Sequence, residues 1–134
     1  MPHPPFHPVT PVTVFELAAP LPKLVMIALI LAVAAALAVL VAKLASGRRL
    51  SGGSAFLSGL RLGAPIIGFL GACDSLLMMT LGAANVPFEP TLKMLAPGFA
   101  EAFLQVGLGF LAGAVAVFAH WAVEARIDRQ VLSA

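Results

Sequence analysis

One uninterrupted apolar run constrains the fold of this chain more than any other feature. Between Lys23 and Lys43 the sequence reads Leu24-Val-Met-Ile-Ala-Leu-Ile-Leu-Ala-Val-Ala-Ala-Ala-Leu-Ala-Val-Leu-Val-Ala42, without one polar side chain. A helix needs about 20 apolar residues to cross the hydrocarbon core of a bilayer. The run is therefore predicted to be a membrane span. In lipid, every backbone polar group must be satisfied within the protein.

The composition agrees with a membrane protein and excludes several other classes. Of the 134 residues, 60% are hydrophobic and 10% are charged, whereas a soluble domain carries about 25% charged residues. The length allows three or four spans and is too short for a two-domain enzyme. A net charge of +2 does not indicate nucleic acid as a partner. The single Cys73 excludes an intrachain disulfide, and it is expected to be a small buried residue.

The N-terminal residues differ in composition from the rest of the chain. Residues 1–13 are rich in proline and are predicted to be an extended or disordered tail. His3 and His7 lie there without a third ligand or a rigid frame, so a solvated tail is favoured over a metal site. A short interfacial helix is expected to start at Thr13 and to stop before Pro20.

Three apolar segments define the predicted architecture. The spans are expected at about 23–43, 55–84 and 97–123, with an amphipathic helical extension after them. Pro65 is expected to kink the second helix or to mark its effective start, and Pro97 to open the third. The predicted fold is an all-α membrane protein with three transmembrane helices in an oligomeric helical bundle. Residues 14–134 form its single domain.

The distribution of basic residues predicts the orientation. With three spans, six basic residues fall on one side of the membrane and two on the other. The six are Lys43, Arg48, Arg49, Arg61, Arg126 and Arg129, and the two are Lys23 and Lys93. The positive-inside rule then places the N-terminus outside and the C-terminus in the cytoplasm. His120 and Trp121 fall at the inner interface, where anchoring is favoured over a proton-relay role for His120.

Two carboxylates within the spans are the candidates for function. Asp74 lies midway along the second span, where a carboxylate is costly and usually faces a partner or a hydrated path. A functional role is favoured there over a structural hydrogen bond. For Glu101, one turn into the expected third span, stabilisation by the helix dipole is an equally good explanation. Gln105 shares a helical face with Glu101, and a hydrogen bond between Gln105 and Asp74 is compatible with their depths.

Small residues recur on the second and third spans. Gly68 and Gly71 lie on the second span, and Gly109 and Gly113 form a Gly-x-x-x-Gly pair on the third. Such residues let helices approach closely, so they indicate packing and name no function. The chain shows no nucleophile–base set and no metal-ligand cluster, so an enzyme is the least favoured class and neither a metal nor a cofactor is expected.

Three segments together resemble the MotA/TolQ/ExbB proton-channel family, and its TolQ/ExbB branch most closely. The first is the apolar span between Lys23 and Lys43. The second, Ala64-Pro-Ile-Ile-Gly-Phe-Leu-Gly71, is similar to the Ala-Pro-x-x-Gly-Leu-x-Gly start of the family's second helix. The third, Leu95-Ala-Pro-Gly-Phe-Ala-Glu-Ala102, is close to the family's Ala-Pro-Gly-Ile-Ala-Glu-Ala motif. The resemblance covers roughly residues 14–130, apart from one large deletion.

The resemblance implies a proton-channel or stator subunit of an energy-transducing complex in the bacterial inner membrane. The complex would couple the proton motive force to transport or envelope work. Its implied partners are further copies of the chain in a pentamer, a single-span protein resembling ExbD or TolR, a TonB- or TolA-like protein and membrane lipid, with no nucleic acid. By position, Glu101 matches the family's functional glutamate.

The sequence departs from the family pattern at defined places. The pore-lining threonines of the family's second and third helices correspond to Ala72 and Val106 here. Ser75 and Gln105 could supply polar groups in their place. Asp74 is about 200° around the helix from Ala72, so it could face a neighbouring helix and not the pore. The family's cytoplasmic domain between its first two helices is replaced by a short loop.

Two alternatives to a conducting subunit remain open at this point. A small proton-coupled transporter would use Asp74 and Glu101 alternately, but it would need internal repeats or broken helices around a substrate site. The sequence shows no repeat. A non-conducting assembly or scaffold protein of the same fold is favoured over the transporter by the missing threonines at Ala72 and Val106.

Overall fold

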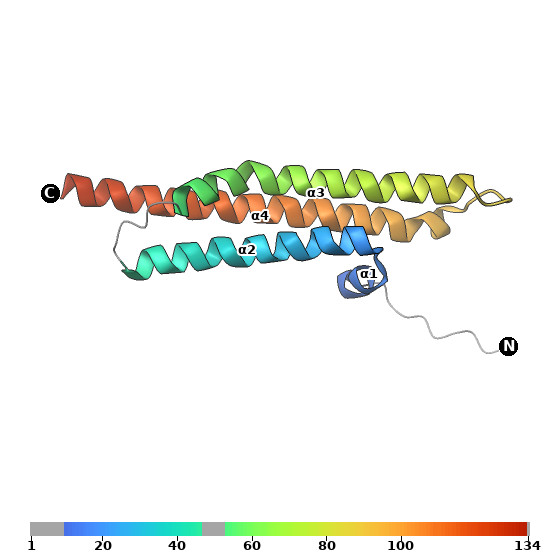
Figure 1. Ribbon diagram of the computed structural model, residues 1–134, viewed down its shortest axis with the longest axis horizontal. Coiled ribbons are helices and arrows are strands. Elements are labelled where there is room, and N and C mark those ends of the chain that lie inside the picture. The colour runs from blue at the N-terminus through green and yellow to red at the C-terminus, as the bar shows by residue number, and fades with distance from the viewer. Residues whose placement is uncertain (1–9, 47–52, 134) are drawn as a thin grey trace.

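The described part of the chain is entirely helical. The structure is a computed structural model that describes residues 10–46 and 53–133, which form four helices and no strand: α1 (Pro11–Leu17), α2 (Pro20–Ser46), α3 (Gly53–Ala84) and α4 (Leu92–Leu132). The last three lie side by side, with α3 antiparallel to the other two (Figure 1). Helical segments over Pro20–Ala45, Ala55–Ala84 and Leu92–Arg129 are long and apolar enough to cross a membrane. The predicted all-α architecture with three candidate spans is confirmed.

The short helix α1 begins inside the expected tail. Thr10 caps it, because the Thr10 hydroxyl accepts from the Thr13 amide at 3.3 Å and the Thr10 amide donates to the Thr13 hydroxyl at 2.8 Å. Pro11 follows at the first helical position, where its missing N–H is no loss. The expectation of disorder is therefore wrong for residues 11–13. The rest of that tail, with His3 and His7, lies outside the described residues.

Helix α3 runs continuously through Pro65, so Pro65 does not mark its start. Proline lacks an N–H, and the carbonyl of Arg61 one turn earlier therefore loses its usual partner. Gly113 of α4 packs against this turn. A Cβ at Gly113 would lie 2.7 Å from Pro65 Cγ and 3.2 Å from the Arg61 oxygen. The missing side chain of Gly113 is what allows α4 to lie against the proline turn.

Helix α4 starts before the position expected for it. Thr91 precedes its first turn, and the Thr91 carbonyl accepts hydrogen bonds from the amides of Met94 at 2.9 Å and Leu95 at 3.3 Å. Pro97 therefore lies inside the helix and not at its first position. It is exposed and close to the helix start, where water can replace the one lost backbone bond. Glu101 consequently lies beyond the first turn, so stabilisation by the helix start does not explain it.

The interior of the bundle is built from small side chains. Gly68 of α3 and Gly109 of α4 bring the two backbones into contact, because a Cβ on Gly68 would lie 2.9 Å from the Gly109 Cα. Buried alanines continue this contact on both sides of the glycines: Ala64, Ala72, Ala102, Ala112, Ala116 and Ala119. Helix α2 covers the pair with Met26, Leu29 and Ala36. Small residues at the helix contacts are typical of membrane bundles.

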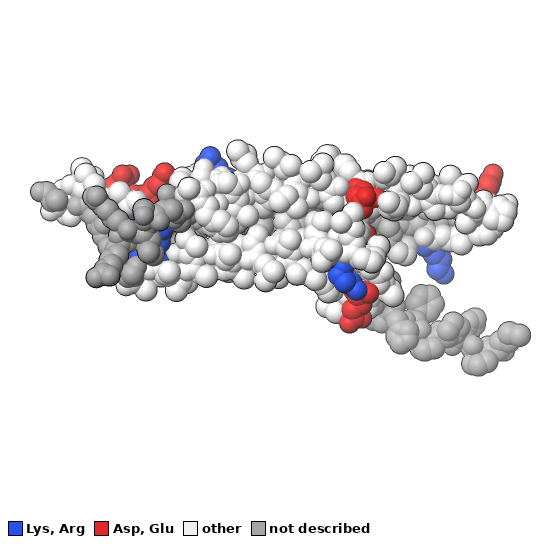
Figure 2. All heavy atoms as spheres, in the orientation of Figure 1, with Lys and Arg blue, Asp and Glu red and all other residues white. Residues whose placement is uncertain are grey.

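The outer surface of the bundle is apolar along most of its length. Large side chains such as Leu31, Phe69, Phe103 and Phe118 are more than 60% exposed, and Figure 2 shows charged residues near the two ends and one acidic patch between them. Cys73 is also exposed, so the expectation that it is buried is wrong. It follows the buried Ala72, and one residue turns a helix by about 100°, away from α4.

The C-terminal part of α4 reaches back to the end of α2. The Arg126 guanidinium donates to the carbonyl of Lys43 at 3.4 Å and to the carbonyl of Leu44. The last carbonyls of a helix have no partner within that helix. Arg126 therefore caps α2 from a helix distant in the sequence.

Candidate functional site: a polar cluster between α3 and α4

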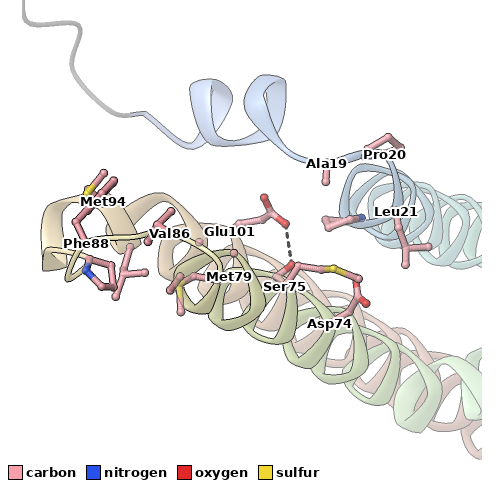
Figure 3. Close-up of a pocket in the computed structure, with 17 residues that line it drawn as sticks. Ala19, Pro20, Leu21, Asp74, Ser75, Met79, Val86, Phe88, Met94 and Glu101 are labelled. Atoms are coloured by element: carbon pink, nitrogen blue, oxygen red, sulfur yellow. Dashed lines mark hydrogen bonds between the residues drawn. The ribbon is translucent and has the colours of Figure 1, made fainter.

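Three polar side chains form a hydrogen-bonded chain between the second and third spans. Gln105 Nε2 donates to Ser75 Oγ at 2.8 Å, and Ser75 Oγ donates to Glu101 Oε1 at 2.7 Å. Figure 3 shows Ser75 of α3 pointing towards Glu101 of α4. Ser75 and Gln105 are buried and Glu101 is half-buried. Both hydrogen bonds run towards the carboxylate, which is therefore the final acceptor of the cluster.

The spacing of these residues explains why they meet. Glu101 and Gln105 are four residues apart on α4, so they lie on the same face. Ser75 faces them from α3, one turn after Gly71. A Cβ at Gly71 would lie 2.0 Å from Gln105 Oε1. Gly71, which the sequence marks only as a packing residue, thus makes room for the Gln105 side chain.

The Gln105 amide is the most buried member of the cluster. Its residue is 0% exposed, and its Oε1 atom has no hydrogen-bond partner among the described residues. An unpaired buried acceptor costs about 1–3 kcal/mol. The amide therefore depends on the single bond to Ser75 for its orientation.

Asp74 lies apart from this chain of hydrogen bonds. Gln105 donates to Ser75, so the hydrogen bond to Asp74 that the depths of the two residues allow is not formed. Consecutive residues on a helix point about 100° apart, and the Asp74 carboxylate is turned towards α2. There it lines a cavity of about 230 Å³ with Leu21, Pro22 and Val25. It makes no hydrogen bond or ion pair with a described residue.

The two positions that correspond to the family's threonines contribute no polar group. Ala72 is buried and Val106 is half-buried. Ser75 follows Ala72 by three residues on α3, and Gln105 directly precedes Val106 on α4. The polar groups between α3 and α4 therefore lie beside the positions of the family's threonines and not at them, as the sequence suggests.

A groove of about 620 Å³ opens beside the cluster. Asp74, Ser75 and Glu101 lie together at one part of it (Figure 3). The remaining lining comes from the start of α2, the C-terminal part of α3, the α3–α4 loop and the first turns of α4, and it includes Met79, Phe88 and Met94. The sequence did not predict these lining residues. An apolar side chain in an apolar span can face either a groove or the lipid, and the sequence does not distinguish the two.

His120 and Trp121 lie far along α4 from the cluster. His120 Nε2 is 3.0 Å from Glu124 Oε1, and the Trp121 ring packs edge-on against Phe118 with centroids 6.4 Å apart. Nineteen residues of one helix separate Glu101 from His120, which is roughly 28 Å at 1.5 Å per residue. Direct proton transfer between them is excluded, and interfacial anchoring by His120 and Trp121 stays a prediction.

The fold and the site together define a class of protein: a small three-span membrane protein with a carboxylate-centred polar cluster between two spans. A family model described as the MotA/TolQ/ExbB proton channel family matches residues 32–134, which include all of α3, α4 and the cluster. The chain therefore belongs to this family, as its motifs suggested, and is a proton-channel-like membrane protein. Comparisons with curated proteins and with solved structures gave no match.

Proposed function

We propose that this chain is a proton-conducting stator subunit of the TolQ/ExbB branch, reduced by the loss of the cytoplasmic domain. It would act in an inner-membrane complex that couples the proton motive force to transport or envelope work. One observation carries the proposal: the carboxylate of Glu101 accepts a hydrogen bond from Ser75 at 2.7 Å while lining an open groove between the spans. Glu101 also occupies the position that corresponds to the family's functional glutamate in the Ala-Pro-Gly-Phe-Ala-Glu block.

The geometry gives each member of the cluster a role in proton transfer. Glu101 binds and releases the proton. The Ser75 hydroxyl can donate to the ionised carboxylate and can accept from the protonated one, because a hydroxyl carries both functions. Gln105 holds Ser75 in place from the buried side. Asp74 supplies a second carboxylate on the same groove.

The proposed assembly is a homopentamer around a single-span partner resembling ExbD or TolR, with a TonB- or TolA-like protein beyond it. The N-terminus would lie outside and the C-terminus in the cytoplasm. Lys43, Arg126 and Arg129 support this orientation, because they gather at one end of the bundle. The Arg126 cap on α2 would stabilise an end of the bundle that the family's cytoplasmic domain otherwise extends.

A non-conducting scaffold of the same fold is the second candidate. Apolar side chains at Ala72 and Val106 favour it, because a hydrated path between α3 and α4 would have to pass them. Proton-coupled transport by a single three-helix unit has no such observation in its favour.

The test measures proton flux. The chain is reconstituted in lipid vesicles with the single-span protein that co-purifies with it, and flux is followed with an enclosed pH dye under a potassium-diffusion potential. Glu101→Gln keeps the shape and removes the charge, so we expect flux to fall to that of empty vesicles. Glu89→Gln, in the exposed α3–α4 loop, is the matched control and should leave flux unchanged.

The outcomes separate the candidates. Undiminished flux through the Glu101→Gln complex would exclude Glu101 as an essential group. A correctly assembled unmodified complex that conducts no protons would favour the scaffold.

A further inference from the structure

The groove beside the cluster combines two carboxylates with a lining that holds no cation. Asp74 and Glu101 both line it, and no Lys, Arg or His does so in the described part of the chain. Lys23 directly follows the lining residue Pro22 in the first turn of α2. Its ammonium donates to the Glu16 carbonyl at 3.0 Å and lies 5.7 Å from the Phe15 ring, so it is committed to α1.

Neither carboxylate has its charge balanced by a described residue. Among the described residues, the Glu101 carboxylate accepts a hydrogen bond only from the neutral Ser75 hydroxyl, and the Asp74 carboxylate has no hydrogen-bond or ion-pair partner. Charged groups that leave water without a partner are costly, and proteins usually pair them. A ligand that brings positive charge into this groove would supply that partner.

The rest of the lining favours an apolar, adaptable ligand. Met78, Met79 and Met94 supply thioethers, which are polarisable and fit irregular shapes. Phe88 supplies an aromatic ring, whose face attracts cations. The volume of about 620 Å³ lies within the range of small-molecule sites, about 300–1,000 Å³.

An inorganic ion fits this groove less well. The described residues contain no group of three or more His, Cys, Asp or Glu side chains placed to hold a metal. The remaining lining is apolar and would offer such an ion few oxygen ligands.

We propose that this groove binds a lipophilic organic cation, one with a quaternary or delocalised positive charge on an apolar body. The charge would lie at Asp74 and Glu101, and the body would contact the methionines and Phe88. Such a molecule dissolves in the membrane and can enter from the side. The proposal does not require the chain to conduct protons, so it stands or falls separately from the proposed function.

The test uses tetraphenylphosphonium and the full chain in lipid nanodiscs, with equilibrium dialysis as the readout. Tetraphenylborate has nearly the same shape and the opposite charge, so it reports on hydrophobic partitioning alone. We expect saturable binding of the cation above that of empty nanodiscs and none of the anion. The double variant Asp74→Asn/Glu101→Gln should weaken cation binding at least roughly tenfold, since it removes both negative charges that would pair with the cation. Asp128→Asn, on the exposed extension, should not.

A second pair of variants tests the location without changing charge. Gly82 lines the groove, and a Cβ there would meet no atom within 4 Å, so Gly82→Leu adds volume to the groove from a position where a side chain can start. Gly107 is equally open but lies outside the groove. We expect Gly82→Leu to weaken cation binding and Gly107→Leu to leave it unchanged.

Two results would overturn the proposal. Equal binding of phosphonium and borate would show partitioning without a charged site. Unchanged cation binding in the double variant or in Gly82→Leu would place the cation elsewhere. Neither result would decide whether Glu101 is required for proton flux.

Discussion

Ser75 connects the two cluster residues that α4 supplies, because its hydroxyl accepts from Gln105 and donates to Glu101. A hydroxyl can do both at once, whereas a carboxylate can only accept and an ammonium can only donate. The buried amide and the half-buried carboxylate thus share one partner. Removing that partner leaves two polar groups unsatisfied at a contact between helices.

Replacing this serine should therefore destabilise the protein. We expect Ser75→Ala to lower the free energy of unfolding by about 1–3 kcal/mol, because the buried Gln105 side-chain amide loses the one hydrogen bond that it makes with a described residue. Unfolding by SDS titration from mixed micelles measures this. Ser75→Thr keeps the hydroxyl and serves as the control. An alanine variant as stable as the unmodified chain would mean that the cluster adds nothing to stability.

Much of this site could be predicted at the level of residue identity. Glu101, Gln105 and Ser75 stand out because polar residues are rare in these spans, and the structure brings all three together. Their connectivity could not be predicted. It depends on the relative rotation of α3 and α4, which Gly68 sets through its backbone contact with Gly109, while Gly71 leaves room for the Gln105 side chain. That rotation is why Ser75, and not Asp74, faces Gln105.

At the scale of elements, two prolines explain where sequence and structure differ. Proline is favoured in the first turn of a helix, which led to an expected start at Pro97. The structure tolerates both prolines inside helices for local reasons. Pro97 is exposed near the helix start, and Pro65 packs against Gly113. A single sequence does not reveal these surroundings of the two prolines. The apolar run that forms α2 contains no such interruption, so its helix could be predicted directly.

The contact between α3 and α4 gives a prediction with a matched control. In Gly109→Leu the new side chain would meet the Gly68 backbone at 2.9 Å and the Ala64 carbonyl oxygen at 2.8 Å. We expect a loss of about 1–3 kcal/mol or more in unfolding free energy, as for other overpacked contacts. In Gly107→Leu the new Cβ would meet no atom within 4 Å, and this variant should be neutral or stabilising. Thermal unfolding in detergent, followed by circular dichroism, compares the two, and equal stabilities would contradict this helix contact.

For the whole molecule, three long helices and short links leave few arrangements in a membrane. Successive spans must alternate in direction, and the structure shows this alternation for α2, α3 and α4 (Figure 1). The absolute orientation then depends on the basic residues alone. Six of the eight Lys and Arg residues fall on the side of the α2–α3 loop and the C-terminus.

The orientation is tested with reporter fusions. Fusions at Gly52 and after Ala134 should report a cytoplasmic location, and one at Glu89 should report the opposite side, because the positive-inside rule retains the basic side in the cytoplasm. Paired alkaline phosphatase and fluorescent-protein reporters give complementary signals at each site. A cytoplasmic signal at Glu89 would refute the three-span topology.

The bond from Arg126 to the end of α2 sets an order for biosynthesis. Leu44 and Arg126 are 82 residues apart, so the ribosome completes α2 long before the residue that caps it exists. Until α4 has inserted, water alone can satisfy the last carbonyls of α2. The contact between these two helix ends therefore forms late in synthesis. A nascent chain that stalls before Arg126 lacks the residue that caps its first span.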